Sequence, residues 1–386
     1  MRKILLTMVV ASLLPAGASN IRAASATNLA VYKPFMGIGY SPFQGDQSPN
    51  YGSYPSINQI TYDLTNSLQY LASEIRTFGM DGTLSNIPAL CSQYGIPCWP
   101  CAYLRTNNLA DNDYELNALI AVGNSGYATT CGLVVGTEAM QSGYDPQTLI
   151  NNINAVRAAT GGRVPVGTSD VTFKFIDNPA VVANCDFVMV NIYAYWAEQP
   201  LSNAVAWTLQ EYRNFTNYFP GKRVLIGEVN WPSSGGNIYW SDPNVVTSVE
   251  NQGIFLGEFV QAAKANNIEY FILDYRDEAW KAQEAIGDVE ENWGLYYTNG
   301  VKKQSLANFQ TSGFMLQARQ GPPGNVVLTI PTYEGNPYYL YQTPGLHPTS
   351  WSPRLSFTGA SGTNQTLLTL PTSGNPVLFF GAGQAF

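Results

Sequence analysis

The sequence predicts an α/β protein, a (β/α)8 TIM barrel followed by a small all-β domain. From Phe35 onward, eight short apolar runs typical of buried parallel strands alternate with amphipathic stretches typical of helices. These pairs lie between residues 27 and 319, a length that suits a barrel of ~250 residues. The alternative fold, a doubly wound open sheet, would normally carry a glycine-rich phosphate turn after an early strand, and the sequence has none.

The expected strands are short and apolar, and each is followed by a helical pattern. The strands are Met36–Tyr40, Glu74–Phe78, Ile96–Leu104, Gly132–Glu138, Val164–Thr168, Asp186–Tyr193, Arg223–Asn230 and Tyr270–Tyr275. The helices are Asn58–Leu71, Leu84–Tyr94, Asp111–Val122, Pro146–Ala159, Asn178–Ala183, Asn203–Phe219, Pro243–Asn266 and a last one near Lys303–Phe309. Asp145 and Asp242 each precede a proline, so each is expected to cap the helix that follows.

The composition changes near Gly321. Residues 321 to 386 contain only Glu334 and Arg354 as formal charges, and β-rich runs recur between prolines and glycines. Residues 320–386 are therefore expected to form a small all-β appendage. It could be a carbohydrate-binding or surface-attachment module, or a passive stabilising cap, and we favour the cap.

The first 26 residues have the order of a secretory signal peptide. The basic residues Arg2 and Lys3 precede an apolar run, Ile4–Leu14, and small residues follow up to Ala26. We expect cleavage after Ala26, with a second acceptable position after Ala18. The apolar run is too short to stay in a bilayer as a permanent helix. We therefore expect a secreted or periplasmic protein with no integral membrane segment after signal removal.

The five cysteines are too few for a disulfide scaffold in a chain of 386 residues, and their pairing stays open. Cys98 and Cys101 have the spacing of a redox motif. They lie, however, in an apolar run that reads as a buried strand, where residues three apart point to opposite faces. We expect buried structural cysteines.

The composition also limits the chemistry. The chain has a single histidine, His347, so catalytic triads and metal sites that need histidines are excluded. A formal net charge of −8 disfavours nucleic acids and anionic membrane surfaces, and favours a neutral partner. Aromatic residues make up 13% of the chain, and the flat faces of Tyr and Trp suit sugar rings. We expect neither a cofactor nor a metal, because the acids are scattered without a ligand cluster.

Two glutamates stand where a TIM barrel places its reacting groups, at the carboxyl ends of strands. Glu138 ends the fourth expected strand and Glu228 lies near the end of the seventh. A lone glutamate in such a place is more often a structural ion-pair partner. A pair of carboxylates across one barrel mouth is, however, what cleavage of a glycosidic bond requires.

Eight motifs resemble glycoside hydrolase family 17, the β-1,3-glucanases, in a bacterial-type form. They are Gly39–Phe43, Ile75–Phe78, Gly136–Ala139, Val164–Thr168, Val188–Tyr193, Gly227–Ser233, Asp277–Lys281 and Asn292–Leu295. The resemblance covers about Phe35 to Phe309, in order. It implies a retaining enzyme acting on β-1,3-glucan, with Glu138 as general acid/base and Glu228 as nucleophile.

The resemblance and the residue types also suggest supporting roles. Tyr193 and Arg76 are candidates to stabilise the ionised form of Glu228, whereas a less polar surrounding and the Glu228 charge should raise the pKa of Glu138. Thr137, where the family often has Asn or Ser, could hold the sugar 2-hydroxyl. The remaining candidates for substrate binding or support are Tyr40, Asn191, Trp231, Glu278 and Lys281, and Trp196 and Trp280 could also stack on sugars.

Two segments depart from the family pattern. Val229 and Asn230 replace the more usual Thr-Gly after the nucleophile, and Leu273–Asp277 replaces a Glu-Ala-Phe-Asp run. Neither change removes a catalytic carboxylate. The leading hypothesis is a secreted β-1,3-glucan hydrolase, and the alternative enzyme is a β-1,3-glucanosyltransferase that uses the same glutamates. A third hypothesis is a non-catalytic glucan-binding protein, which the presence of both glutamates disfavours.

Overall fold

The computed structural model describes residues 7–12, 33–236, 244–283, 287–307 and 309, and six strands between residues 317 and 384. The chain divides into two compact units. One is Lys33–Gln310, and the other combines Met1–Tyr32 with Thr311–Phe386.

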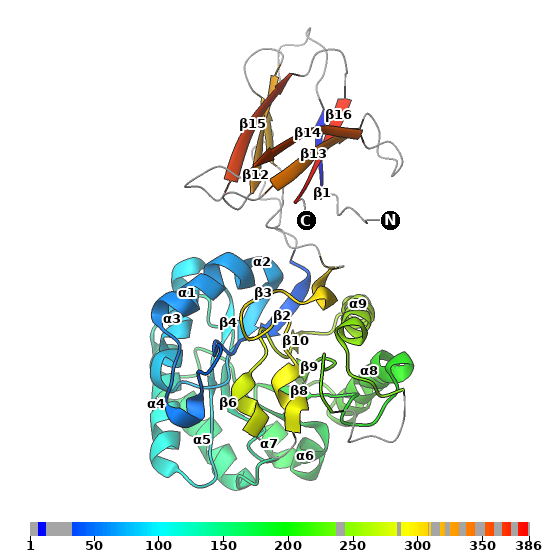
Figure 1. Ribbon diagram of the computed structural model, residues 1–386. Helices are drawn as coiled ribbons and strands as arrows, with labels where there is room; N and C mark the ends of the chain where they lie inside the picture. Colours follow the sequence, from blue (N-terminus) through cyan, green and yellow to red (C-terminus); the bar gives the residue numbers. More distant parts are fainter. Residues whose placement is uncertain are drawn as a thin grey trace. The chain divides into compact units, whose positions relative to one another are not determined.

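The unit Lys33–Gln310 is built on a closed parallel barrel (Figure 1). Its strands are β2 (Phe35–Gly39), β3 (Ala72–Arg76), β4 (Cys98–Trp99), β5 (Cys101–Ala102), β6 (Leu133–Thr137), β7 (Val166–Val171), β8 (Phe187–Asn191), β9 (Arg223–Val229) and β10 (Tyr270–Ile272). They pair in the order β4-β3-β2-β10-β9-β8-β7-β6-β5. β4 and β5 are halves of one strand path, interrupted by Pro100, which has no N–H to donate. The two edges of the sheet therefore meet, and the predicted eight-stranded barrel is confirmed.

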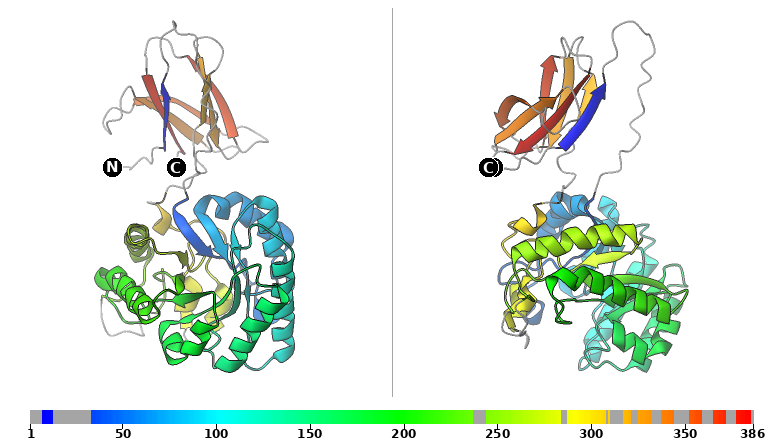
Figure 2. Two further views of the ribbon diagram at one scale, coloured as in Figure 1. Left: turned by 180° about the vertical axis from the view of Figure 1, so that it is seen from behind. Right: turned by 90° about the vertical axis from the view of Figure 1, so that its right-hand side faces the viewer.

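Helices surround the strands, as the further views show (Figure 2). They are α1 (Ile57–Asp63), a π-helical turn η2 (Leu64–Leu68), α2 (Gln69–Leu71), α3 (Ile87–Tyr94), α4 (Leu109–Asn124), α5 (Pro146–Ala159), α6 (Thr172–Asp177), α7 (Pro179–Ala183), α8 (Leu201–Tyr218) and α9 (Val249–Ala265). Short 3-10 turns are η1 (Pro49–Tyr51), η3 (Gly82–Asn86), η4 (Ala279–Gln283), η5 (Gly287–Asn292) and η6 (Gln304–Leu306). The helix α6 has no counterpart among the expected elements.

The two expected aspartate caps have different outcomes. Asp145 caps α5, because its Oδ2 accepts a hydrogen bond of 2.8 Å from the Thr148 N–H. The expected start of the later helix at Pro243 is wrong, since α9 begins at Val249. Its cap is Ser248, whose hydroxyl oxygen accepts from the Asn251 N–H at 2.9 Å. Asp242 and Pro243 themselves lie outside the described residues.

The core has two layers. Alternate strand residues fill the barrel interior, among them Trp99, Phe187 and Phe271, while the residues between them face the helices. The interior is so crowded that a Cβ at Gly167 would lie 2.1 Å from the Phe187 carbonyl oxygen and one at Gly37 would lie 2.4 Å from the Phe271 ring. The small residues of these strands therefore make room for the large ones.

All five cysteines are free, and four of them are buried. Cys98 and Cys101 lie in β4 and β5, as the apolar run around them predicts. Burial raises the pKa of the Cys101 and Cys185 thiols to about 12. These groups are therefore protonated at neutral pH, which removes the reactivity of a thiolate.

The second unit contains two antiparallel sheets. They are formed by β1 (Thr7–Ser12), β11 (Gln317–Gln320), β12 (Asn325–Pro331), β13 (Pro337–Thr343), β14 (Ser352–Thr358), β15 (Gln365–Pro371) and β16 (Val377–Gln384). The strand orders are β1-β16-β13-β14 and β11-β12-β15. The strand β1 falls within the expected signal peptide, whose removal stays a prediction and would take β1 from the mature chain. No helix among the described residues combines the length and apolar composition needed to cross a bilayer.

Candidate active site

The candidate site is a cavity of ≈ 840 Å³ at the carboxyl ends of the barrel strands. Glu138 and Glu228 both line it, together with Thr137, Asn191 and Tyr193. Glu138 directly follows β6, Glu228 belongs to β9, and Asn191 ends β8. The barrel therefore brings both predicted glutamates to one cavity, as their positions at strand ends require.

Three donors converge on the Glu228 carboxylate, which is buried. Nη1 of Arg76 lies 3.1 Å from Oε1, and the Thr137 hydroxyl donates to the same oxygen at 3.3 Å. The Tyr193 hydroxyl donates to Oε2. The guanidinium is itself fixed, since it donates to the Gly227 carbonyl at 2.8 Å and to the Thr137 hydroxyl at 2.7 Å. A fixed cation and two hydroxyls suit a carboxylate that must stay ionised.

Tyr193 keeps its phenolic proton in this arrangement. Burial, followed by the charges of Glu228 and Glu138, raises the pKa of Tyr193 well above its ordinary value. Its ring also packs edge-on against Trp293, with centroids 5.1 Å apart. The hydroxyl is therefore a permanent donor held in place by an aromatic neighbour.

Glu138 has a different environment. Its backbone adopts the left-handed conformation, with φ of 47°, and its N–H donates to the Ser169 carbonyl at 2.8 Å. Its Oε1 accepts one hydrogen bond, from Asn191 Nδ2 at 2.8 Å, and Asn191 is oriented by the Ser169 hydroxyl at 3.0 Å. Burial and then the Glu228 charge raise the pKa of Glu138 to about 7. The two carboxyl groups therefore differ in their partners, since Glu228 faces a guanidinium and two hydroxyl donors, whereas Glu138 Oε1 accepts from one amide.

Glu278 and Lys281 meet on another wall of the same cavity. Lys281 Nζ lies 2.7 Å from Glu278 Oε2, and the Trp280 indole N–H donates to Oε1 at 3.1 Å. The Ser41 hydroxyl also donates to Oε1. Beside them Asp274 is buried, and burial followed by the Glu278 charge raises the pKa of Asp274 well above its ordinary range. Neither Ser41 nor Asp274 is among the site residues predicted from the sequence.

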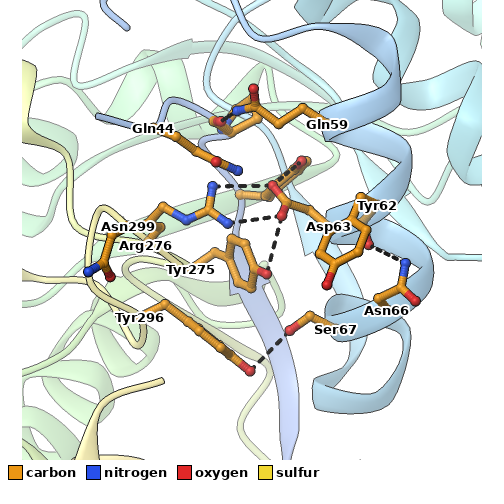
Figure 3. Close-up of polar contacts among 12 residues, drawn as sticks. Gln44, Gln59, Tyr62, Asp63, Asn66, Ser67, Tyr275, Arg276, Tyr296 and Asn299 are labelled. Carbon is orange, nitrogen blue, oxygen red and sulfur yellow. Dashed lines mark hydrogen bonds and ion pairs between the residues drawn. The ribbon is translucent and has the colours of Figure 1, made fainter. Parts of the chain in front are cut away.

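Tyr40 lines the cavity, and a buried carboxylate holds its hydroxyl group. The hydroxyl donates to Asp63 Oδ2 at 3.1 Å, and Arg276 Nη2 lies 2.9 Å from Asp63 Oδ1. Figure 3 shows Asp63 between the Arg276 guanidinium and Tyr275, whose hydroxyl donates to Oδ1 at 3.5 Å. A buried ion pair therefore positions this aromatic wall, and no sequence pattern relates residues so far apart in the chain.

Trp231 does not lie on the cavity. Its side chain has 0% exposure, its indole N–H donates to the Val246 carbonyl at 3.0 Å, and its ring packs near Phe255 and Tyr195. Its ring therefore offers no face to a sugar. The aromatic residues that do line the cavity are Tyr40, Phe43, Phe78, Tyr103, Phe173, Tyr193, Trp196, Trp207, Trp280 and Trp293. Within the described part of the chain, no group of three or more His, Cys, Asp or Glu side chains is placed to hold a metal ion.

Comparison with known proteins gives relatives among fungal glucan enzymes. A glucan endo-1,3-beta-glucosidase from Emericella nidulans is 26% identical over 292 residues, which cover 69% of this chain and 44% of that protein. A relative from Aspergillus niger, which is provisionally named as the same enzyme, is 30% identical over 296 residues. These residues cover 69% of this chain and 42% of that protein. The chain thus spans less than half the length of these curated relatives.

Solved structures resemble the barrel unit. A glycoside hydrolase family 17 beta-1,3-glucanosyltransferase from Rhizomucor miehei is 29% identical, with a TM-score of 0.61 over 70% of this chain and 96% of that one. An endo-laminarinase from Formosa has a TM-score of 0.62 over 71% of this chain and 86% of that one. At 17% identity, this similarity shows the fold alone. The family model of the BtgE/BtgC glycoside hydrolase domain matches residues 37–294. These residues include both cavity glutamates and every barrel strand except the first two residues of β2, so the chain belongs to the BtgE/BtgC glycoside hydrolase domain family.

Proposed function

We propose that this chain is a retaining glycosidase that acts on β-1,3-glucan by double displacement. The observation that carries the proposal is the contrast between the two cavity glutamates. Glu228 is paired with Arg76 and two hydroxyl donors, whereas the pKa of Glu138 is raised to about 7. One group is thus suited to attack as a carboxylate and the other to donate a proton.

In the first displacement, Glu228 attacks the anomeric carbon while Glu138 gives its proton to the leaving oxygen. The glycosidic bond breaks, and the leaving sugar departs as an alcohol from a covalent glycosyl ester on Glu228. In the second displacement, the Glu138 carboxylate takes a proton from an incoming hydroxyl group. The oxygen of that group attacks the anomeric carbon, and Glu228 is released as a carboxylate. Two inversions leave the configuration retained.

β-1,3-glucan is proposed as the substrate from the relatives. The curated relatives are named glucan endo-1,3-beta-glucosidases, and an active-site mutant of the Rhizomucor miehei enzyme, 28% identical to this chain, was solved with laminaritriose. The aromatic lining of the cavity fits such a ligand, because Tyr and Trp rings supply apolar faces with polar edges.

Glucanosyl transfer is the second candidate function. It is favoured by one observation, that the matched Rhizomucor miehei structure, titled a glucanosyltransferase, is covered over 96% of its length. Hydrolysis and transfer share the first displacement and differ in whether water or a sugar hydroxyl attacks the ester. Incubation with laminari-oligosaccharides separates them, since a hydrolase gives shorter products alone and a transferase also gives longer ones. An unchanged substrate would instead support a non-catalytic glucan-binding protein.

We also propose that the chain is exported and that its chemistry is confined to the barrel domain. The first 26 residues carry the charge and apolar order of a signal peptide, which supports a secreted or periplasmic enzyme. The catalytic domain is proposed to be residues 27–319. None of the described residues between 320 and 386 is among those that line the cavity described above, so the β-rich residues 320–386 are proposed to be dispensable for the chemistry. Mass measurement of the exported mature chain tests the cleavage site.

A further inference from the structure

Asp170 is a buried acidic residue of β7 that is not among the residues lining the catalytic cavity. Its Oδ2 accepts hydrogen bonds from the Met140 N–H at 2.8 Å and from the Gln141 N–H at 3.4 Å. Its Oδ1 accepts from the Val171 N–H at 2.9 Å. The side chain of Asp170 therefore joins β7 to the turn that directly follows Glu138.

The Asp170 side chain is an ionised carboxylate at neutral pH. Burial raises the pKa of Asp170 to about 6, while the N–H groups of Val171, Met140 and Gln141 act in the opposite direction. Hydrogen bonds to an ionised acceptor are roughly twice as strong as those between neutral groups. A buried carboxylate also needs such donors, because burial without them is costly. The turn and the Asp170 carboxylate therefore stabilise each other.

Glu138 has a backbone conformation that a residue with a side chain seldom adopts. Its φ of 47° lies in the left-handed region, and such a conformation persists only where the surrounding structure fixes it. The Glu138 N–H donates to the Ser169 carbonyl at 2.8 Å. Asp170, the next residue of β7, accepts from the second and third residues after Glu138. Two consecutive residues of β7 thus hold the backbone on both sides of Glu138.

The side chain of Glu138 depends on the same strand. The Ser169 hydroxyl donates to Asn191 Oδ1 at 3.0 Å, and Asn191 Nδ2 donates to Glu138 Oε1 at 2.8 Å. This chain of contacts reaches the carboxyl group only while the turn keeps the Glu138 backbone in place. A general acid must lie within hydrogen-bond reach of the oxygen that it protonates. A displacement of about 1 Å can cost about 10²-fold in rate.

We propose that Asp170 is a positioning residue for Glu138, whose carboxylate anchors the turn after the acid and so fixes the place from which the proton is given to the leaving oxygen. This inference rests on the proposed function, in which Glu138 is the general acid. It adds a residue that touches no substrate and controls the acid part of the first displacement. The nucleophilic part should depend on it much less, because Glu228 belongs to β9 and none of its three donors described above comes from β7.

The test compares two substrates that differ in their need for the acid. A laminari-oligosaccharide has a poor leaving group that requires the proton, whereas a dinitrophenyl β-laminaribioside requires little protonation. The measured quantity is kcat/KM, which reports the first displacement. For Asp170→Ala we expect kcat/KM to fall about 10- to 100-fold more on the oligosaccharide than on the aryl glycoside. Glu138→Ala should show a difference at least as large.

Asp170→Asn is the second variant, and it carries the test if Asp170→Ala does not fold. It has the shape of the original side chain and keeps one acceptor oxygen, so it should show the same preference for the aryl glycoside to a smaller degree. A misfolded fraction lowers kcat/KM equally on both substrates. Impaired folding therefore cannot imitate the expected result.

Asp186→Ala is the matched control. Asp186 Oδ2 also accepts from a backbone N–H, that of Val166 at 2.8 Å, but Asp186 precedes β8 and so lies at the opposite end of the barrel. Its losses should be equal on the two substrates. Equal losses in the Asp170 variants, while Glu138→Ala still distinguishes the substrates, would overturn the positioning role alone. Equal losses in Glu138→Ala as well would overturn the acid role on which the proposed function depends.

Discussion

Arg76 and Glu228 form a buried ion pair, in which Nη1 lies 3.1 Å from Oε1 and the arginine side chain has 0% exposure. The pair joins β3 to β9 within the barrel. Because Thr137 hydrogen-bonds to both members, the carboxylate of Glu228, the proposed nucleophile, is held by a small network rather than by one contact. The contacts that hold Glu228 in the candidate site therefore also join two strands of the barrel, β3 and β9.

Arg76→Met should therefore destabilise the fold and abolish turnover. Removing one member of a buried pair leaves an uncompensated charge, and we expect a loss of about 3–5 kcal/mol in the free energy of unfolding. The control is Arg223→Met, which breaks the exposed pair with Glu269, whose atoms lie 2.6 Å apart. That loss should stay below about 1 kcal/mol. Urea denaturation of both variants checks the prediction, and equal losses would contradict it.

The activity should fall as the pH rises through about 7, the raised pKa of Glu138. Above that pH the acid loses the proton that the leaving group needs. Asn191 donates to Glu138 Oε1 and so stabilises its charged form, which keeps the pKa lower than burial alone would. Asn191→Ala should therefore move the alkaline limb of the kcat/KM profile upward by about one pH unit.

Asn154→Ala serves as the control for this profile, because Asn154 is exposed and its Nδ2 donates to Asn184, away from the cavity. Its alkaline limb should match that of the unchanged protein. A downward movement of the limb in Asn191→Ala, or none, would show that this hydrogen bond does not set the titration of the acid.

Much of this site could be predicted from local sequence. Glu138 and Glu228 each follow an apolar run, and closed parallel barrels bring strand ends together. Trp231 is a predicted candidate for sugar stacking, and the structure places it in the core instead. Strand residues alternate between two faces, so a side chain three positions after Glu228 faces the helices, where Trp231 meets Phe255. The alternation of side chains along a strand therefore indicates that Trp231 packs against the helices.

Other parts of the site had no local signal. Asp63 and Arg276 are 213 positions apart, and neither lies in a motif that indicates the other. The start of α9 was missed for a different reason. Ser248 and Asp242 are both good N-cap residues, and sequence alone does not rank the two. Contacts that the closure of the barrel creates can be read only once the fold is known.

Removal of residues 320–386, the β-rich part proposed to be dispensable, should leave turnover of a soluble oligosaccharide within about twofold. The lining of the catalytic cavity runs from Tyr40 to Trp293, which is the physical reason. Kinetics on laminaripentaose check this. A loss of turnover while circular dichroism still shows the folded barrel would contradict the prediction, and weaker binding to insoluble glucan alone would make the β-rich part a binding module.

The first product released from a β-1,3-glucan should be the β-anomer. Two displacements at one carbon restore the starting configuration, which the paired roles of Glu138 and Glu228 require. Proton NMR during the first minutes of reaction, before mutarotation, reads the anomer directly. An initial α-anomer would rule out a covalent intermediate on Glu228.

Azide rescue of Glu138→Ala and Glu228→Ala tests the assigned roles most directly. Without its acid, Glu138→Ala should lose about 10²- to 10⁴-fold on a substrate with a poor leaving group and much less on an activated aryl glycoside. Azide should then yield a β-glycosyl azide, because the ester on Glu228 still forms and azide needs no base. Glu228→Ala forms no ester, so azide should attack once and yield the α-azide. The same anomer of glycosyl azide from both variants, or near-native rates without azide, would contradict the division of labour between Glu138 and Glu228.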